Sequence, residues 1–227
     1  MFESLLNFWK GKDFLIQVFG EFKEMLTLTK NMYDLVIRKL IDNETVGGLK
    51  EQIYEIDKKV NESEKLIRRK IAQHLLLQPS VDVTACLLLM SVVKDAERLG
   101  DYCKNLFEIT ELLEKPINKK LYNELFDSID KDVAELFGNT QKAFMESNEA
   151  KARLSFDEEN KIIRRSDEAI KKLAKSTMPV NEAVCFTLLA RHFKRLASHL
   201  ANIASAVVMP IQDLDYFDEK QLHDKKK

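Results

Sequence analysis

Two acidic side chains in one segment of the sequence are spaced so that they can act together. Glu97 and Asp101 are four residues apart, so in a helix they lie one turn apart on one face. Asn105 lies on the same face one turn further along. Like charges at this spacing repel each other, and the repulsion grows when the groups are removed from water. A hard cation such as Mg²⁺, Mn²⁺, Ca²⁺ or iron relieves the repulsion, because these ions take oxygen ligands. A metal site is therefore our first hypothesis for this segment.

The surroundings of the pair favour a buried helix as its host. Asp or Glu occupies 37 of the 227 positions, so the same spacing also arises by chance. The pair follows the most apolar stretch of the chain, Val83 to Val93, and Gly100 permits the close approach of another helix. The alternative is that no metal binds and that ion pairs with Lys94, Arg98 and Lys104 compensate Asp57, Glu97 and Asp101.

The elements that position these side chains are predicted to be helices. The chain has only 6 Gly and 4 Pro, whereas a β-sandwich, a barrel or a doubly wound sheet needs many tight turns. Between the breaks, apolar residues recur with the 3.6-residue period of a helix. We predict six long helices, at residues 13–43, 49–77, 81–114, 117–146, 150–176 and 180–209.

The prolines divide these helices into two sets of three. Pro79 and Pro179 each fall between the second and third helix of a set, and Pro116 and Pro210 each follow a third helix. Short connections make neighbouring helices antiparallel, so each set is expected to close as a three-helix bundle. The predicted all-α fold has a first repeat at 13–115, a second repeat at 116–211 and a charged, frayed tail at 212–227.

A short amphipathic segment is predicted at residues 1–12, before the first repeat. Phe2, Leu5, Leu6 and Trp9 recur at helical spacing, and Gly11 is suited to end the turn. The segment is expected to dock on its own bundle; the alternative is contact with a membrane or a partner.

Composition and motifs argue against several classes of function. The 36 basic and 37 acidic residues nearly cancel, so the chain has no net cationic field for nucleic acid or an anionic membrane. The sequence contains no G-x-S-x-G, no P-loop, no Gly-rich dinucleotide turn and no H-E-x-x-H. It also lacks the paired Glu-x-x-His motifs of a ferritin-like di-iron site. We expect no enzymatic activity.

The cysteines and the termini indicate a cytoplasmic protein. Cys86, Cys103 and Cys185 are odd in number and lie in apolar stretches, which predicts core thiols in a reducing compartment. The N-terminus lacks the pattern of a secretion signal. The longest charge-free window, residues 196–212, is too short and polar to span a bilayer.

A resemblance to a known family rests on the acidic segment. The string Glu97-Arg98-Leu99-Gly100-Asp101, followed by Asn105, resembles the acidic signature of the PhoU family in the third helix of a three-helix repeat. The segment IDKKVNESEKLIRRKIAQHLLLQP is similar to that family's second helix, and the resemblance extends from about residue 15 to residue 210. It implies two tandem bundles, each able to bind a multinuclear cluster, commonly of iron or zinc.

The resemblance also implies partners. It points to a cytoplasmic regulator of phosphate uptake that contacts the phosphate ABC importer and a sensor histidine kinase. The membrane association would then be peripheral and made through that partner, and a homodimer is compatible with it. One alternative is an accessory subunit of an ion-coupled phosphate transporter, and another is a helical scaffold that binds no metal.

The second repeat departs from the acidic signature. When Arg98-Leu99 is aligned with Arg195-Leu196, Lys194 takes the place of Glu97 and Ser198 takes the place of Asp101. When the second helices are aligned on Ile67 and Ile170, Asn160, Arg164 and Asp167 stand opposite Asp57, Asn61 and Glu64.

These departures restrict the metal prediction to the first repeat. Fixed cations at Lys194 and Arg164 repel a divalent ion by several kcal/mol at low dielectric. We therefore predict at most one metal centre, containing iron, zinc, manganese or magnesium. Its expected ligands are Glu97, Asp101, Asp57, Asn61 and Glu64.

The second repeat carries a group of cationic side chains that could bind an oxyanion such as phosphate. The expected anion-binding residues are Arg164, Arg191, Lys194 and Arg195, with His192 and His199 beside them. The alternative is a solvated basic face that pairs with Glu168 or Asp157. We expect the first bundle to supply a stiff face and the second bundle a partner surface.

Overall fold

The computed structural model describes residues 13–214, and in this range the chain is helical without a β-strand. The predicted all-α class is confirmed. The elements are α2 (Asp13–Leu40), α3 (Leu49–Leu77), α4 (Val83–Leu112), α5 (Lys119–Phe126), α6 (Ile129–Glu146), α7 (Glu149–Leu173), α8 (Val180–Val208) and a short 3₁₀ helix, η1 (Ile211–Asp213).

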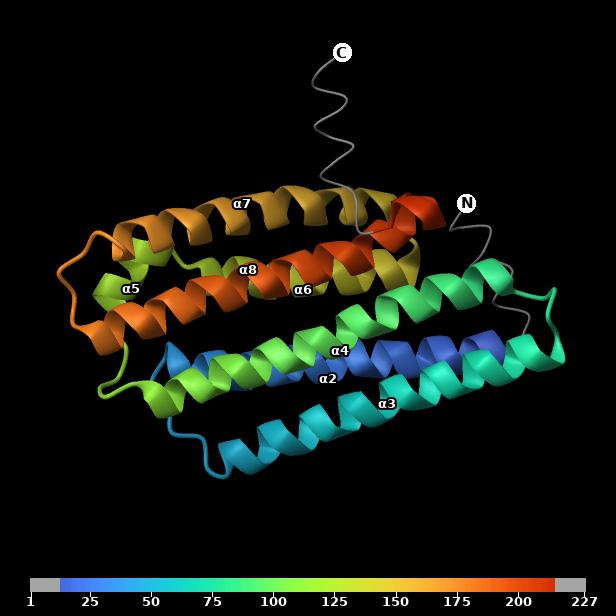
Figure 1. Cartoon of the computed structure of the whole chain (residues 1–227), viewed down its shortest axis with the longest axis horizontal. Helices are drawn as coiled ribbons and strands as arrows, with labels where there is room; N and C mark the ends of the chain where they lie inside the picture. The colour runs from blue at the N-terminus through green and yellow to red at the C-terminus, as the bar shows by residue number, and fades with distance from the viewer. Residues whose placement is uncertain (1–12, 215–227) are drawn as a thin grey trace, which may run out of the picture.

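The helices form two sets of three that lie side by side along the long axis of the molecule (Figure 1). Within the first set α2, α3 and α4 contact one another, and within the second α6, α7 and α8 do the same. The sets meet where α4 packs against α8 and α2 packs against α6, and the buried apolar side chains of both form one core. The helix pair α4 and α8 therefore lies at the centre of the protein.

Aromatic side chains join α2 to α6 across the two sets. The rings of Phe22 and Phe144 are 4.8 Å apart between centroids, and those of Tyr33 and Phe137 are 5.3 Å apart. The hydroxyl of the buried Tyr33 donates a hydrogen bond to the backbone oxygen of Asp130, at 2.7 Å. Apolar packing and a buried polar contact thus both hold the two sets together.

The predicted helix at 117–146 is wrong as a single element, because the chain turns between α5 and α6. Asp127 and Ser128 both adopt the left-handed backbone conformation, with φ of 49° and 60°. The hydroxyl of Tyr122 donates to the Asp130 carboxyl across this turn, at 2.7 Å. Asp and Ser favour turns over helix interiors because their side chains compete for backbone hydrogen bonds, so these two residues were an available signal.

The other helices follow the predicted spans within three residues at each end. The predicted frayed tail is wrong at its start, since Gln212 and Asp213 belong to η1 and Leu214 packs in the core. The rest of the tail and the predicted amphipathic segment at 1–12 lie outside the described residues. Among the described helices, none is long and apolar enough to cross a membrane.

Candidate functional site

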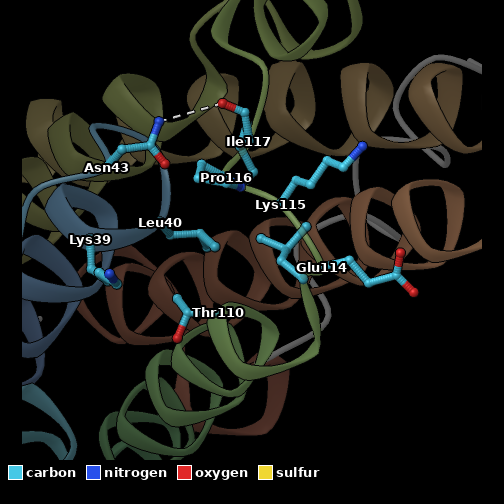
Figure 2. A pocket seen from close by; sticks show the side chains of 9 residues that line it. Lys39, Leu40, Asn43, Thr110, Glu114, Lys115, Pro116 and Ile117 are labelled. Atoms are coloured by element: carbon cyan, nitrogen blue, oxygen red, sulfur yellow. Dashed lines mark hydrogen bonds between the residues drawn. The ribbon is translucent and has the colours of Figure 1, made fainter.

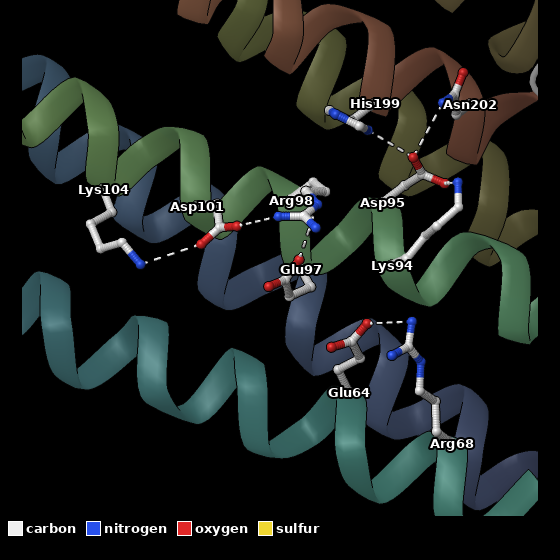
Figure 3. Close-up of polar contacts among 10 residues, drawn as sticks. All are labelled: Glu64, Arg68, Lys94, Asp95, Glu97, Arg98, Asp101, Lys104, His199 and Asn202. Carbon is white, nitrogen blue, oxygen red and sulfur yellow. Dashed lines mark hydrogen bonds and ion pairs between the residues drawn. The ribbon is translucent and has the colours of Figure 1, made fainter.

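The predicted metal ligands lie on the facing sides of α3 and α4 in the first repeat. Glu97 and Asp101 are half-buried on α4 and point toward α3, as Figure 3 shows. Asp57, Asn61 and Glu64 are half-buried along α3. The helical spacing read from the sequence thus does bring the acidic residues of two helices to one shared face.

Cationic side chains of the same helix occupy this face. The Arg98 guanidinium donates to Asp101 at 2.7 Å and lies 3.6 Å from Glu97. Lys104 bridges the helices, because its ammonium group is 3.0 Å from Asp57 on α3 and 3.3 Å from Asp101 on α4. Two of the three ion-pair partners expected in the metal-free alternative therefore engage the carboxylates.

The third expected partner, Lys94, turns to a different carboxyl group. Its ammonium nitrogen lies 3.3 Å from Asp95, whereas Glu64 is paired with Arg68 of its own helix at 2.9 Å.

The surroundings of Glu97 disfavour its ionised form. Burial raises the pKa of this carboxyl group above its usual value, and the nearby charge of Asp101 raises it further. The guanidinium of Arg98 acts in the opposite direction, while Glu64 and Asp57 add smaller upward contributions to the pKa. The ionised form of Glu97 is therefore disfavoured in this cluster.

The carboxylate oxygens suit a hard cation in their chemistry but not in their arrangement. In residues 13–214 no three His, Cys, Asp or Glu side chains converge closely enough to hold a metal ion. A metal ion at this face would require Arg98 and Lys104 to leave the carboxylates first. The arrangement fits two protein cations, and the metal centre stays a prediction.

Gly100 lies between the two acidic residues, where α4 approaches its neighbours. A Cβ atom at this position would be 3.5 Å from Val60 on α3 and 3.8 Å from Thr29 on α2, which is ordinary van der Waals contact. The helices do come close, but the space accommodates a methyl group. The glycine is not required sterically.

In the second repeat, Lys194 occupies the position equivalent to Glu97 and forms an ion pair. Lys194 on α8 donates to both oxygens of Asp167 on α7, at 2.8 and 2.9 Å. Asp167 stood opposite Glu64 in the sequence alignment, so the pair spans the helices that correspond to α3 and α4. One fixed cation and one carboxylate thus replace the acidic face of the first repeat.

The predicted anion-binding residues lie on two helices of the second repeat. Arg164 on α7 and Arg191 and Arg195 on α8 are exposed, while Lys194 is paired with Asp167. His192 and His199 turn away toward the first repeat, where their rings lie 5.8 and 5.5 Å from that of Tyr102. Burial, together with the smaller effect of the Arg191 charge, lowers the pKa of His192 to about 4. His192 is therefore neutral near pH 7 and not a cation of the predicted group.

The residue that the sequence analysis missed is Asp95, which lies at the contact between α4 and α8. Its carboxyl oxygen Oδ1 is 2.7 Å from His199 Nδ1 and accepts a hydrogen bond from Asn202 at 3.2 Å (Figure 3). Asp95 is fully buried. It follows Val92 by three residues and precedes Leu99 by four, so a charged residue within the apolar stripe was the available signal.

The contacts at this crossing are related by the internal repeat. With Arg98 aligned to Arg195, Asp95 corresponds to His192 and Tyr102 corresponds to His199. The Asp95–His199 contact on one side of the crossing is thus matched by the Tyr102–His192 contact on the other. The two repeats meet through equivalent positions that carry different side chains.

A cavity of about 190 Å³ lies at the C-terminal end of α4, where the linker leads to the second repeat (Figure 2). Asn43 and Ile117 close one side through a hydrogen bond of 3.4 Å from the Asn43 amide to the Ile117 backbone oxygen. The remaining lining residues are Lys39, Leu40, Thr110, Leu113, Glu114, Lys115 and Pro116. The lining includes none of the predicted site residues.

The comparisons with known proteins agree with this two-repeat geometry. The sequence matches the PhoU domain twice, over residues 22–110 and 122–207. The fold is similar to that of PhoU from Pseudomonas aeruginosa, with a TM-score of 0.75 and 21% identity over 88% of this chain and 97% of that chain.

A second solved structure with a similar fold is the phosphate transport system regulatory protein PhoU from Streptococcus pneumoniae. Its TM-score is 0.73, at 19% identity over 85% of this chain and 92% of that chain. The search of curated proteins found no match. Because the PhoU domain covers both three-helix sets and more than half of the residues, the chain belongs to the PhoU family.

Proposed function

We propose that this protein regulates phosphate uptake through contacts with other proteins and without catalysis. The observation that carries the proposal is the match of both repeats to the PhoU domain. The proposed partner is a subunit of a phosphate transporter or a sensor histidine kinase, through which the protein would associate peripherally with the membrane.

The regulatory function is tested in the native host. Deletion of the gene is expected to uncouple phosphate uptake from the external phosphate concentration, measured with radiolabelled phosphate in phosphate-rich and phosphate-limited cells. Restoring the wild-type gene should restore the response. Equal uptake responses in the deletion strain and the wild type would contradict the proposal.

We infer that the second repeat supplies part of the partner surface. The exposed Arg164, Arg191 and Arg195 lie on α7 and α8, the two helices that the Lys194–Asp167 pair joins. Exposed cations of this kind select an acidic partner and set the rate of association more than the affinity.

The partner surface is tested by co-purification with a tagged full-length chain from phosphate-limited cells. The variant Arg191→Glu/Arg195→Glu is expected to lose the partner that the wild type captures. Arg69→Glu is the control, because it reverses an exposed arginine on α3 of the first repeat. If the double variant and the control retain the same partner, the second repeat is not the docking surface.

The identity of the captured protein decides between the partner classes. An ATPase or permease of an ABC importer, or a histidine kinase, supports the proposal as stated. An ion-coupled phosphate permease indicates an accessory subunit of that transporter, and a partner unrelated to phosphate indicates a helical scaffold. Light scattering of the purified protein tests whether it forms a homodimer.

The predicted metal centre and anion site each have a separate test. Metal analysis of the purified wild type is compared with Glu97→Ala/Asp101→Ala, and equal metal content would end the metal prediction. Calorimetry with millimolar phosphate tests whether an anion binds to the group Arg164, Arg191, Lys194 and Arg195. The absence of a heat signal would contradict the predicted anion site.

A further inference from the structure

An exposed apolar stripe runs along the beginning of α4. Val83, Leu87 and Met90 follow one another by four and three residues, which places them on one face of the helix. All three are exposed in the described structure, and Leu87 is 49% exposed. The end of α3 adds Leu76 and Leu77, each 82% exposed, on the other side of the same turn. We call these five side chains the α4 end patch.

The corresponding end of the second repeat has only part of this patch. Val180 and Val184 occupy the positions equivalent to Val83 and Leu87, and they are also exposed. The position equivalent to Met90 is the polar Thr187, and Leu173 at the end of α7 is buried. The first repeat therefore has additional exposed apolar surface at this end.

The start of α2 lies at the same end of the molecule. The ring of Phe14, next to the first residue of α2, stacks on His74 near the end of α3 with the centroids 4.1 Å apart. The point at which residues 1–12 join the described part of the chain is therefore at the same end of the molecule as the α4 end patch. Fully extended these twelve residues would reach about 40 Å, and as a helix about 18 Å, whereas Val83 to Met90 spans only about 10 Å.

We propose that residues 1–12 dock on the α4 end patch through Phe2, Leu5, Leu6 and Trp9. These side chains share one face at helical spacing, so a single short element can cover the stripe. A second copy of the chain is a poorer occupant, because a specific interface needs about 20–30 residues a side and the patch has five. Tethering favours the chain's own segment, since docking is then intramolecular.

Trp9 supplies a direct probe of this docking, because it is the sole tryptophan of the chain. In the full-length protein its fluorescence emission is expected to be blue-shifted and weakly quenched by acrylamide. Leu87→Glu places a charge in the stripe, so it is expected to shift the emission to the red and to increase quenching. Leu76→Ser/Leu77→Ser, at two largely exposed positions, is expected to act in the same direction without unfolding the protein.

Val184→Glu is the matched control. Val184 occupies the repeat position equivalent to Leu87 and is also 49% exposed, but it lies in the second repeat. Its emission and quenching should equal those of the wild type. Red-shifted Trp9 emission that acrylamide quenches strongly in the wild type would overturn the proposal. Emission that is unchanged in both patch variants would also overturn it.

Two further outcomes would assign the segment to another occupant. If the blue shift developed only after addition of phosphatidylglycerol vesicles, the segment would be a membrane anchor and the proposal would be wrong. If the blue shift disappeared on dilution, the segment would dock on a second copy, which also overturns intramolecular docking. A blue shift that is independent of vesicles and concentration supports the proposal.

Discussion

The Nδ1 atom of His199 lies 2.7 Å from Oδ1 of Asp95 and joins the third helices of the two repeats. The same oxygen accepts from Asn202, one turn further along α8. Because Asp95 is fully buried, its carboxyl group depends on these two residues and on Lys94 for compensation. The contact between the repeats therefore includes a polar pairing that tolerates little change on either side.

His199→Ala is expected to lower the free energy of unfolding by about 1–3 kcal/mol, because it leaves a buried acceptor with fewer partners. Urea unfolding followed by circular dichroism measures the change. Ser198→Ala, at a half-buried neighbouring position, is the control and should have a smaller effect. Equal stability of His199→Ala and the wild type would mean that the Asp95 contact contributes nothing net.

His192 predicts a dependence of stability on pH. Its pKa is lowered from 6.5 to about 4 in the folded state, first by burial and then by Arg191. Its Nδ1 atom is also buried without a hydrogen-bond partner among the described residues. Between these two pKa values the unfolded chain binds more protons than the folded chain. Stability is therefore expected to fall as the pH decreases from 6.5 toward 4.

The variant His192→Gln removes this titration while keeping a neutral polar side chain. Its urea midpoint is expected to change less with pH than that of the wild type across the same interval. The acidic residues titrate in both proteins, so only the difference between the two curves is interpreted. Parallel curves would contradict the role of His192.

Glu97 has the opposite pH behaviour, because its pKa is raised in the folded state by burial and by Asp101. Ionisation of Glu97 therefore costs stability above its folded pKa, and that cost is relieved as the pH falls through this pKa. We expect Glu97→Gln to stabilise the metal-free protein at neutral pH and to have less effect at acidic pH. Thermal unfolding with a chelator at pH 7 and pH 4.5 measures this, and destabilisation at pH 7 would contradict it.

Gly100→Ala is expected to stabilise the protein by about 0.5–1 kcal/mol, because glycine in a helix interior loses more backbone entropy on folding. The added Cβ meets Val60 at ordinary contact distance, 3.5 Å. Gly48→Ala provides a contrast of opposite sign, since Gly48 has a φ of +63°, where an L side chain is strained. Denaturant melts of both variants test the pair, and a destabilised Gly100→Ala would show that the three helices cannot accommodate a methyl group.

The sequence by itself determined the helices and the repeat. Helical periodicity and the placement of Gly and Pro are local properties, so the spans of α3 and α8 could be predicted closely. Residues in one helix also share a face whatever the surroundings, which is why Glu97 and Asp101 were found. The break at Asp127 and Ser128 was missed because the periodicity continues through a turn that involves only two residues.

Only the tertiary structure decided which charges compensate one another. Lys104 meets Asp57 across 47 positions of sequence, and His199 meets Asp95 across 104. Such pairings depend on how two helices cross and on their relative rotation, which no local pattern encodes. The sequence therefore identified the carboxylates that need a cation, and the packing of α4 against α3 and α8 determined which protein groups lie beside them.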